Sequence, residues 1–93
     1  MEGKIIKTAG QAELVTPRNG TDFQLEELQK IVGGHIEIVH LKEGRYMVAN
    51  EDGLALGLPD NPAAGLIALL ESEYPNNGNI VGNVLICEKS MIK

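Results

Sequence analysis

Glu37 is the side chain best placed to do chemistry, because it lies inside the otherwise apolar segment 36–39. His35 is two residues away and would share a face with Glu37 on a strand. A carboxylate and an imidazole on one face can form an acid–base pair or supply two metal ligands. His40 falls on the opposite face of a regular strand, so a third ligand is missing and we predict no metal site. Glu37 then faces either water or a cleft that holds a ligand.

Arginine and asparagine side chains supply the other groups that could recognise a ligand. Arg18 and Arg45 could each clamp a phosphate or carboxylate with two hydrogen bonds. Asn50, Asn61 and Asn83 could read the edge of a heterocycle, since an amide pairs a donor with an acceptor. Structural roles as turn former, helix cap and strand-end group also explain these asparagines, and we favour those roles. The candidate ligand-binding residues are Glu37, Arg45, Asn50 and Asn61.

Nucleophiles are few and poorly placed. Ser72 and Ser90 lie where the sequence indicates exposed segment ends, and no serine–histidine–acid arrangement can be assembled from them. Cys87, the single cysteine, ends an aliphatic run beside Glu88, which indicates a buried structural thiol. The glycine pair 33–34 follows a helical pattern and precedes a strand, the reverse of a phosphate-binding loop. We predict no catalytic residue and no cofactor.

Short strands account for much of the chain. Turn-forming residues at 17–20, 42–45 and 50–53 separate the apolar runs, and Asp52-Gly53 is a strong hairpin signal. The last run is apolar on both faces, which is typical of a strand in the centre of a sheet. The expected strands are residues 4–7, 13–16, 35–41, 46–49, 54–56 and 80–87.

A capping signal and an apolar repeat predict the first helix. Thr21 and Gln24 fit a capping box, in which each side chain satisfies a backbone N–H near the helix start. Leu25, Leu28 and Val32 recur at spacings of three and four and so form the buried stripe. The glycine pair that follows ends the helix.

A second helix is predicted to begin after Asn61, a favoured N-cap, with Pro62 at its first position. Residues 62–70 are apolar nearly all round, a pattern typical of a helix that is buried under a sheet or in a subunit contact. Gly65 costs this helix about 1 kcal/mol relative to alanine and allows close packing. Because one thin core is too small to cover such a helix, we expect the chain to form a homo-oligomer through it.

Composition bounds the architecture and the environment. The 93 residues suffice for a single domain, with an ordered core at about 3–88 and an exposed tail at 89–93. We predict an α+β fold, in which a mostly antiparallel sheet of five or six short strands packs against two helices. A net charge of −5 disfavours nucleic acid as a partner. The apolar runs are too short to span a membrane, and one cysteine without a signal peptide favours the cytoplasm.

Four blocks of the sequence together resemble the family called domain of unknown function 3846. They are residues 23–39, 50–53, 57–64 and 80–84, and the likeness covers about residues 3–88. The family pattern favours an aromatic residue where this chain has His35. The resemblance implies a small accessory protein that is encoded by a phage or mobile element and works in a bacterial cytoplasm, with evasion of host defence as one role. It implies no established activity.

Three hypotheses of function follow. The first is a non-catalytic binding module, a homo-oligomer that sequesters a small nucleotide-type ligand. The second is an inhibitor or adaptor that docks its acidic face and second helix on a host protein. The third, ranked last, is a small hydrolase that uses Glu37 with His35 or His40. An enzyme is therefore the less favoured class.

Overall fold

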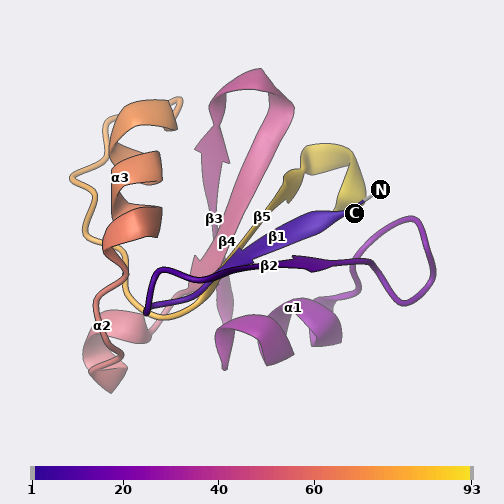
Figure 1. Cartoon of the computed structure of the whole chain (residues 1–93), viewed down its shortest axis with the longest axis horizontal. Coiled ribbons are helices and arrows are strands. Elements are labelled where there is room, and N and C mark those ends of the chain that lie inside the picture. Colours follow the sequence, from indigo (N-terminus) through magenta and orange to yellow (C-terminus); the bar gives the residue numbers. More distant parts are fainter. Residues whose placement is uncertain (1, 93) are drawn as a thin grey trace.

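Five short strands form one antiparallel sheet in the computed structural model, which describes residues 2–92 (Figure 1). The order across the sheet is β2-β1-β5-β4-β3, so β5, the last strand in the chain, lies in the centre as predicted. The sheet and its accompanying α-helices confirm the predicted α+β class. The strands are β1 (Gly3–Ile6), β2 (Ala12–Val15), β3 (Ile36–Leu41), β4 (Arg45–Asn50) and β5 (Val84–Glu88).

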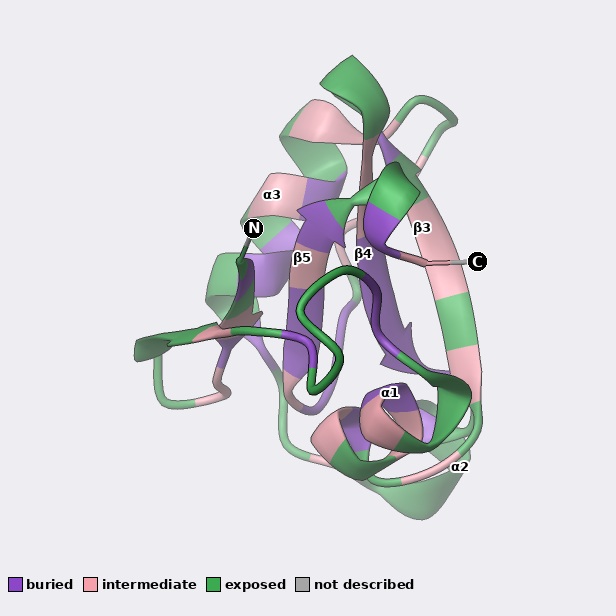
Figure 2. Ribbon diagram, turned by 90° about the vertical axis from the view of Figure 1, so that its right-hand side faces the viewer, coloured by how far each residue is buried: buried purple, intermediate pink, exposed green. Residues whose placement is uncertain are grey.

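Helices lie on both faces of this sheet, and each face has its own apolar cluster. α1 (Leu25–Val32) packs on one face against the cluster that contains Val48 and Leu85. α3 (Pro62–Glu71) packs on the other face against the cluster that contains Met47. These three strand side chains are fully buried, and Figure 2 shows the central strands β4 and β5 buried for most of their length. Each face of the sheet is therefore covered at least in part.

α1 begins three residues later than predicted. Its N-cap is Gln24, and the capping box joins Gln24 to Glu27 rather than Thr21 to Gln24. The prediction is wrong because Phe23 is buried and its backbone N–H donates to the Met91 carbonyl, 2.7 Å away. This long-range hydrogen bond keeps the residues before Gln24 in a non-helical conformation. The hydrogen bond from the Gln24 backbone N–H is the main cause that lowers the pKa of Glu27.

The inward side of α1 consists of Leu28 and Val32, as predicted. Leu25, the third member of the predicted stripe, is instead 58% exposed. The later start makes Leu25 the first helical residue. Because helical side chains point back toward the N-terminus, a side chain at that position reaches past the end of the helix and misses the sheet.

A short helix, α2 (Gly53–Leu56), follows β4 where the sequence predicts a hairpin and a strand at 54–56. The prediction is wrong because β4 lies between β3 and β5, so neither of its edges is free to pair with another strand. The Asn50 side chain also accepts the backbone N–H of Asp52, 2.8 Å away, and turns the chain as the strand ends. Gly57 then closes α2 in the left-handed conformation, with φ at 70°.

α3 begins as predicted, with the Asn61 side chain accepting the backbone N–H of Ala64 at 3.1 Å. Its buried residues are all small: Ala64, Gly65 and Ala68. Small side chains let the helix axis approach the sheet closely and leave the leucines outside. One side of this apolar helix is therefore buried under the sheet, as predicted, and its other side is exposed in the single chain. Among the described residues, no helix has the length and apolar character needed to cross a membrane.

β5 is shorter than the predicted strand at 80–87. Val81 forms an isolated antiparallel bridge with Asp60, and the Asn61 backbone N–H donates to the Ile80 carbonyl, 2.8 Å away. These bonds tie the segment to the start of α3, so β5 begins only at Val84. The ends of the other four strands lie within one residue of the prediction.

The C-terminal segment packs against the domain, which corrects the prediction of an exposed tail at 89–93. A 3₁₀ turn at Lys89–Met91 follows β5 and buries Met91 completely in the cluster under α1. Ile92 forms an isolated parallel bridge with Phe23. The sequence could not reveal this contact, because it joins two segments about seventy residues apart. Residue 93 of the predicted tail lies outside the described residues.

Candidate functional site

The four candidate ligand-binding residues do not lie in one site. Glu37 and Asn50 line the same small cavity, whereas Arg45 lies at the opposite end of β4 from Asn50. Asn61 lies at the start of α3, beside a separate surface depression. The strand order and the position of α3 thus divide these residues among three places.

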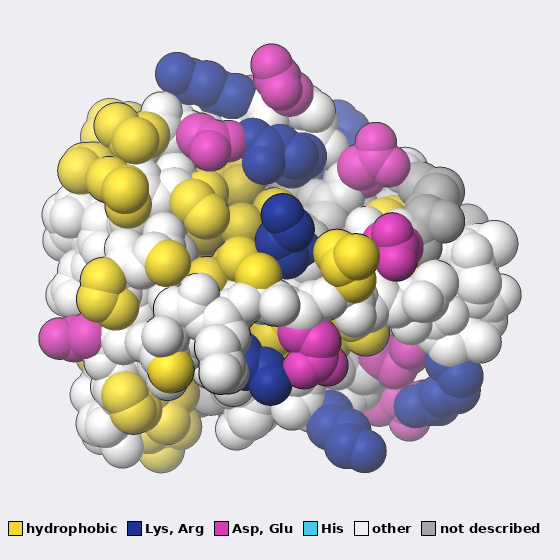
Figure 3. All heavy atoms as spheres, viewed as in Figure 1, with side chains coloured by type: hydrophobic (Ala, Val, Ile, Leu, Met, Phe, Trp, Pro, Cys, Tyr) yellow, Lys and Arg dark blue, Asp and Glu magenta, His cyan; other side chains and the backbone are white. Residues whose placement is uncertain are grey.

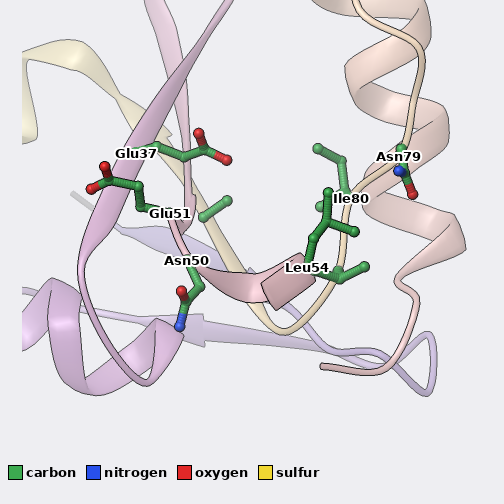
Figure 4. A pocket seen from close by; sticks show the side chains of 8 residues that line it. Glu37, Asn50, Glu51, Leu54, Asn79 and Ile80 are labelled. Atoms are coloured by element: carbon green, nitrogen blue, oxygen red, sulfur yellow. The ribbon is translucent and has the colours of Figure 1, made fainter. Parts of the chain in front are cut away.

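Glu37 projects from β3 on the face of the sheet that α3 covers. It is paired with Ala49 of β4, which belongs to the apolar cluster of that face. The cavity beside it has a volume of about 50 Å³ and lies between β3, β4, α2 and the segment before β5 (Figure 4). Such a cavity holds a few water molecules and is far too small for a nucleotide. Its lining residues are Glu37, Ala49, Asn50, Glu51, Leu54, Asn79, Ile80 and Val81.

Two carboxylates make this cavity acidic. Glu37 lies opposite Ala49, so by register Glu51 is its diagonal neighbour. Figure 4 shows the Glu37 carboxylate pointing toward the cavity and the Glu51 carboxylate pointing away from it. Glu37 is exposed to water, but the neighbouring atoms remove part of its hydration and so raise its pKa, and the charge of Glu51 raises it further. An anionic ligand such as a phosphate would be repelled here. The site therefore suits neither the size nor the charge of a nucleotide.

Replacement of Glu37 by glutamine is expected to stabilise the fold slightly at neutral pH. Folding raises the pKa of Glu37 above its ordinary value of 4.5. Above the folded pKa the carboxylate is ionised in both states, and its charge then lowers the free energy of unfolding. Below pH 4.5 the group is protonated in both states, so this destabilisation disappears. The gain at pH 7 should be about 0.3 kcal/mol, as for a solvent-screened pair of like charges across two strands. Urea unfolding of both proteins at pH 7 and pH 3 measures it. A gain that is equal at the two pH values would contradict this explanation.

The Asn50 side chain is used inside the fold. It is 4% exposed, and its amide N–H donates to the Val32 carbonyl at the end of α1, 3.1 Å away. Its oxygen accepts the backbone N–H of Asp52. Figure 4 shows this amide pointing away from Glu37 and toward α1. The polar atoms of Asn50 therefore connect α1 to the turn after β4.

The Asn61 side chain is likewise used inside the fold and is 1% exposed. Its amide nitrogen donates to the Ile6 carbonyl at 2.9 Å and to the Gly82 carbonyl at 2.8 Å. Its oxygen accepts the Ala64 backbone N–H as the cap of α3. One side chain thus joins the end of β1, the segment before β5 and the start of α3.

The histidines do not assemble an acid–base pair with Glu37. Nδ1 of His35 lies 3.2 Å from the carboxylate of Asp52. His40 projects on the opposite face of β3 from Glu37, and its ring meets Tyr46 edge-on with centroids 4.9 Å apart. Within residues 2–92, no group of three or more His, Cys, Asp or Glu side chains is placed to hold a metal ion.

Cys87 is buried on the face of β5 that α1 covers, as the sequence predicts. Burial, assisted by the charge of Glu88, raises its pKa to about 11. The thiolate is the reactive form, so at pH 8 only about one thiol in a thousand is ionised. We expect the folded protein to resist DTNB at pH 8 and the unfolded protein to react at once. Rapid stoichiometric labelling of the folded protein would contradict this description.

A larger groove lies beside α3, over β1, β2 and β5, and we call it the α3 groove. Its volume is about 510 Å³, which is within the range of small-molecule sites. Figure 3 shows apolar side chains in this region, with charged side chains both between and around them. The apolar side chains that line it are Ile6, Leu14, Ile67 and Ile86, and the charged ones are Glu2, Lys4, Arg45, Glu71 and Glu88.

Both signs of charge are present along the α3 groove. Arg45 of β4 forms an ion pair with Glu71 of α3, so its guanidinium already has a carboxylate partner. Lys4 forms no ion pair with any residue in the described part of the chain. Glu2 and Glu88 add two carboxylates. Lys4 is therefore the cation of the groove that is available to an anion.

The outer side of α3 exposes three large apolar side chains, Leu66, Leu69 and Leu70, which we call the leucine ridge. Their exposed fractions are 57%, 56% and 63%. Figure 3 shows apolar side chains gathered along the edge of the molecule where α3 and α2 lie. The sequence predicts this helix to be apolar but does not reveal which side stays exposed. Ala64 and Ala68 mark the side that faces the sheet, but the equally small Ala63 is exposed, so residue size alone does not identify that side.

The match to a family model covers almost the whole chain. Residues 4–91 match the family described as a domain of unknown function (DUF3846), which is the family that the sequence blocks resemble. No curated protein and no solved structure matches the chain significantly. Because the family model spans far more than half of the sequence, this chain belongs to the DUF3846 family.

Proposed function

We propose that this protein is a non-catalytic binding module that acts through a protein–protein contact made by the leucine ridge. The observation that carries the proposal is that three neighbouring leucines on one helix are each more than half exposed. A contiguous exposed apolar surface of this kind is typical of an interface.

The sequence of α3 supports this reading. A helix that only covers a sheet normally carries charged or polar residues on its outer side. Residues 62–70 of this chain contain no charged residue and no polar side chain. Leu54 and Leu56 of α2, together with Tyr74 after α3, are also more than half exposed. The region from α2 to Tyr74 therefore has the composition of a contact surface.

Purification from bacterial cells tests the proposal. The tagged wild type is compared with the double variant Leu66→Ser/Leu70→Ser and with Leu25→Ser, a control in which an equally exposed leucine of α1 is changed. Native mass spectrometry then measures the mass of each purified species. We expect the wild type and the control to hold a stoichiometric protein companion, either a second copy or a host protein, and the double variant to lose it. A wild type that is a bare monomer, or a companion that the double variant keeps, would contradict the proposal.

Sequestration of a small nucleotide-type ligand is a second candidate function, and the α3 groove is the observation that favours it. The groove has a suitable volume of about 510 Å³, an apolar floor and Lys4, which forms no ion pair within residues 2–92. The carboxylates of Glu2 and Glu88 on the same groove oppose an anionic ligand. Mass spectrometry of ligands released by heating tests this candidate, with thermal melts of the wild type and Lys4→Gln in the presence of nucleotides. This candidate would be excluded if the purified protein releases no ligand and if no nucleotide changes its melting temperature.

We also propose a biological setting for this binding module. It is an accessory protein of a phage or mobile element that works in the bacterial cytoplasm, and it contributes to evasion of host defence. The support for this setting is membership of the DUF3846 family together with the resemblance described above. Infection assays with a host that carries a defence system test it. Equal infection by phages with and without the protein would contradict it.

A further inference from the structure

The leucine ridge and the α3 groove lie side by side on the molecule. The ridge is on the side of α3 opposite Ala64 and Ala68, so it points away from the chain's own sheet. The groove opens along the same helix, because α3 packs toward the β3 edge and leaves part of β1 and β5 uncovered (Figure 1). This part of the surface therefore contains a convex apolar element next to a concave one.

We propose that a second copy of this chain covers this surface, with the leucine ridge of each copy seated in the α3 groove of the other. The inference rests on the proposed function and names its partner. In a two-fold dimer the same patch meets itself, so the patch must be complementary to its own shape. A ridge that stands beside a groove meets this condition, whereas a ridge alone does not.

The chemistry of the two elements is matched as well. The ridge consists of leucine side chains, and Ile6, Leu14 and Ile86 line the groove that would receive them. Leu14 is 61% exposed in the single chain, so the groove also lacks a cover. A standard interface occupies about 800 Å² on each partner and combines an apolar centre with a charged rim. Ridge and groove supply the apolar centre, and Arg45, Glu71 and Glu88 supply charged groups beside it, while Lys4 lies in the groove itself, between Leu14 and Ile86.

The uncharged ridge lets a second copy approach along this side of the molecule in spite of the net charge of −5. Residues 62–70 are uncharged, so the ridge itself adds no repulsion between copies. The groove carries the carboxylates of Glu2 and Glu88 and also Lys4, which has no ion-pair partner in the described part of the chain. When a two-fold axis brings two such rims together, groups of opposite sign can meet across the contact.

Sedimentation equilibrium of purified protein tests the dimer with one variant on each element. Leu70→Glu places a charge on the ridge and Leu14→Glu places one in the groove, while Leu25→Glu is the control. All three leucines are more than half exposed, so circular dichroism should show an unchanged fold. We expect the wild type and the control to dimerise, and each test variant to dimerise at least about 30-fold more weakly.

A mixture of the two test variants distinguishes this dimer from other contacts. Each homodimer of a variant has both ridge–groove contacts damaged, whereas the mixed dimer keeps one contact intact, so mixing should restore part of the association. A wild type that stays monomeric up to about 1 mM, variants that dimerise normally, or mixing without any recovery would overturn the inference. If the wild type is monomeric and the ridge variants lose a host protein instead, the inference fails while the proposed function stands.

Discussion

Replacement of Asn61 by alanine is expected to lower the free energy of unfolding by about 3 kcal/mol. The variant loses the cap of α3, which contributes about 1 kcal/mol. It also leaves the buried carbonyls of Ile6 and Gly82 without their donor, at a further cost of about 2 kcal/mol. For a domain of this size the melting temperature should fall by about 12 to 24 °C. Thermal unfolding followed by circular dichroism measures the change.

Two further variants separate these contributions. Asn61→Asp keeps the oxygen that accepts the Ala64 N–H but directs a carboxylate oxygen at the Ile6 and Gly82 carbonyls, so it should also be destabilising at pH 7. Asn79→Ala changes an exposed asparagine nearby and should alter stability by less than about 0.5 kcal/mol. An Asn61→Ala protein as stable as the wild type would show that this amide does not join the three segments.

Replacement of Gly65 by alanine is expected to destabilise the protein by about 2 kcal/mol, although it improves helix propensity. Propensity alone predicts a gain of about 1 kcal/mol at a helical glycine. A Cβ atom at this position would instead lie 2.2 Å from the backbone carbonyl oxygen of Gly78. Because backbone cannot rotate aside as a side chain can, the segment around Gly78 must move, and overpacking of this kind costs about 1–3 kcal/mol. Urea unfolding gives the magnitude.

The sign of the Gly65→Ala effect makes the test decisive. Ala63→Gly, at an exposed position of the same helix, measures the propensity term and should cost about 1 kcal/mol. The amide resonance of Gly78 should shift in Gly65→Ala and stay unchanged in Ala63→Gly. A Gly65→Ala protein more stable than the wild type would show that α3 does not approach the segment before β5 so closely.

Elements whose ends depend on local contacts were predictable from the sequence. Asn61 caps α3 because its side chain bonds to a backbone N–H three residues later, and Gly33 ends α1 with φ at 83°. The central place of β5 was also predictable, because a strand apolar on both faces needs neighbours on both sides.

Contacts between distant segments decided the elements that the sequence did not predict correctly. α1 starts at Leu25 because Phe23 is held by the C-terminal segment. Residues 54–56 form a helix because β4 already has a strand on each side. Met91 is buried because the 3₁₀ turn after β5 folds back under α1. Such contacts cannot be predicted from the residues that are neighbours in the sequence.

The candidate site was predictable only in part. Glu37 can be identified because a carboxylate inside an apolar run is visible in the sequence, and the structure places it at the edge of a cavity. The α3 groove cannot be identified in this way, because Lys4, Arg45 and Glu71 meet only through the strand order and the placement of α3. The leucine ridge lies between these cases, since its composition was apparent but its exposure was not.

The central claim is that the leucine ridge is covered by protein when the molecule is at work. Labelling of introduced cysteines inside bacterial cells tests it directly, with Leu69→Cys on the ridge and Leu25→Cys as the equally exposed control, both with Cys87 changed to alanine. A cell-permeable maleimide should label Leu69→Cys at least about tenfold more slowly than Leu25→Cys, and the difference should vanish in denaturant. Equal labelling rates at the two positions in the folded protein would contradict the claim.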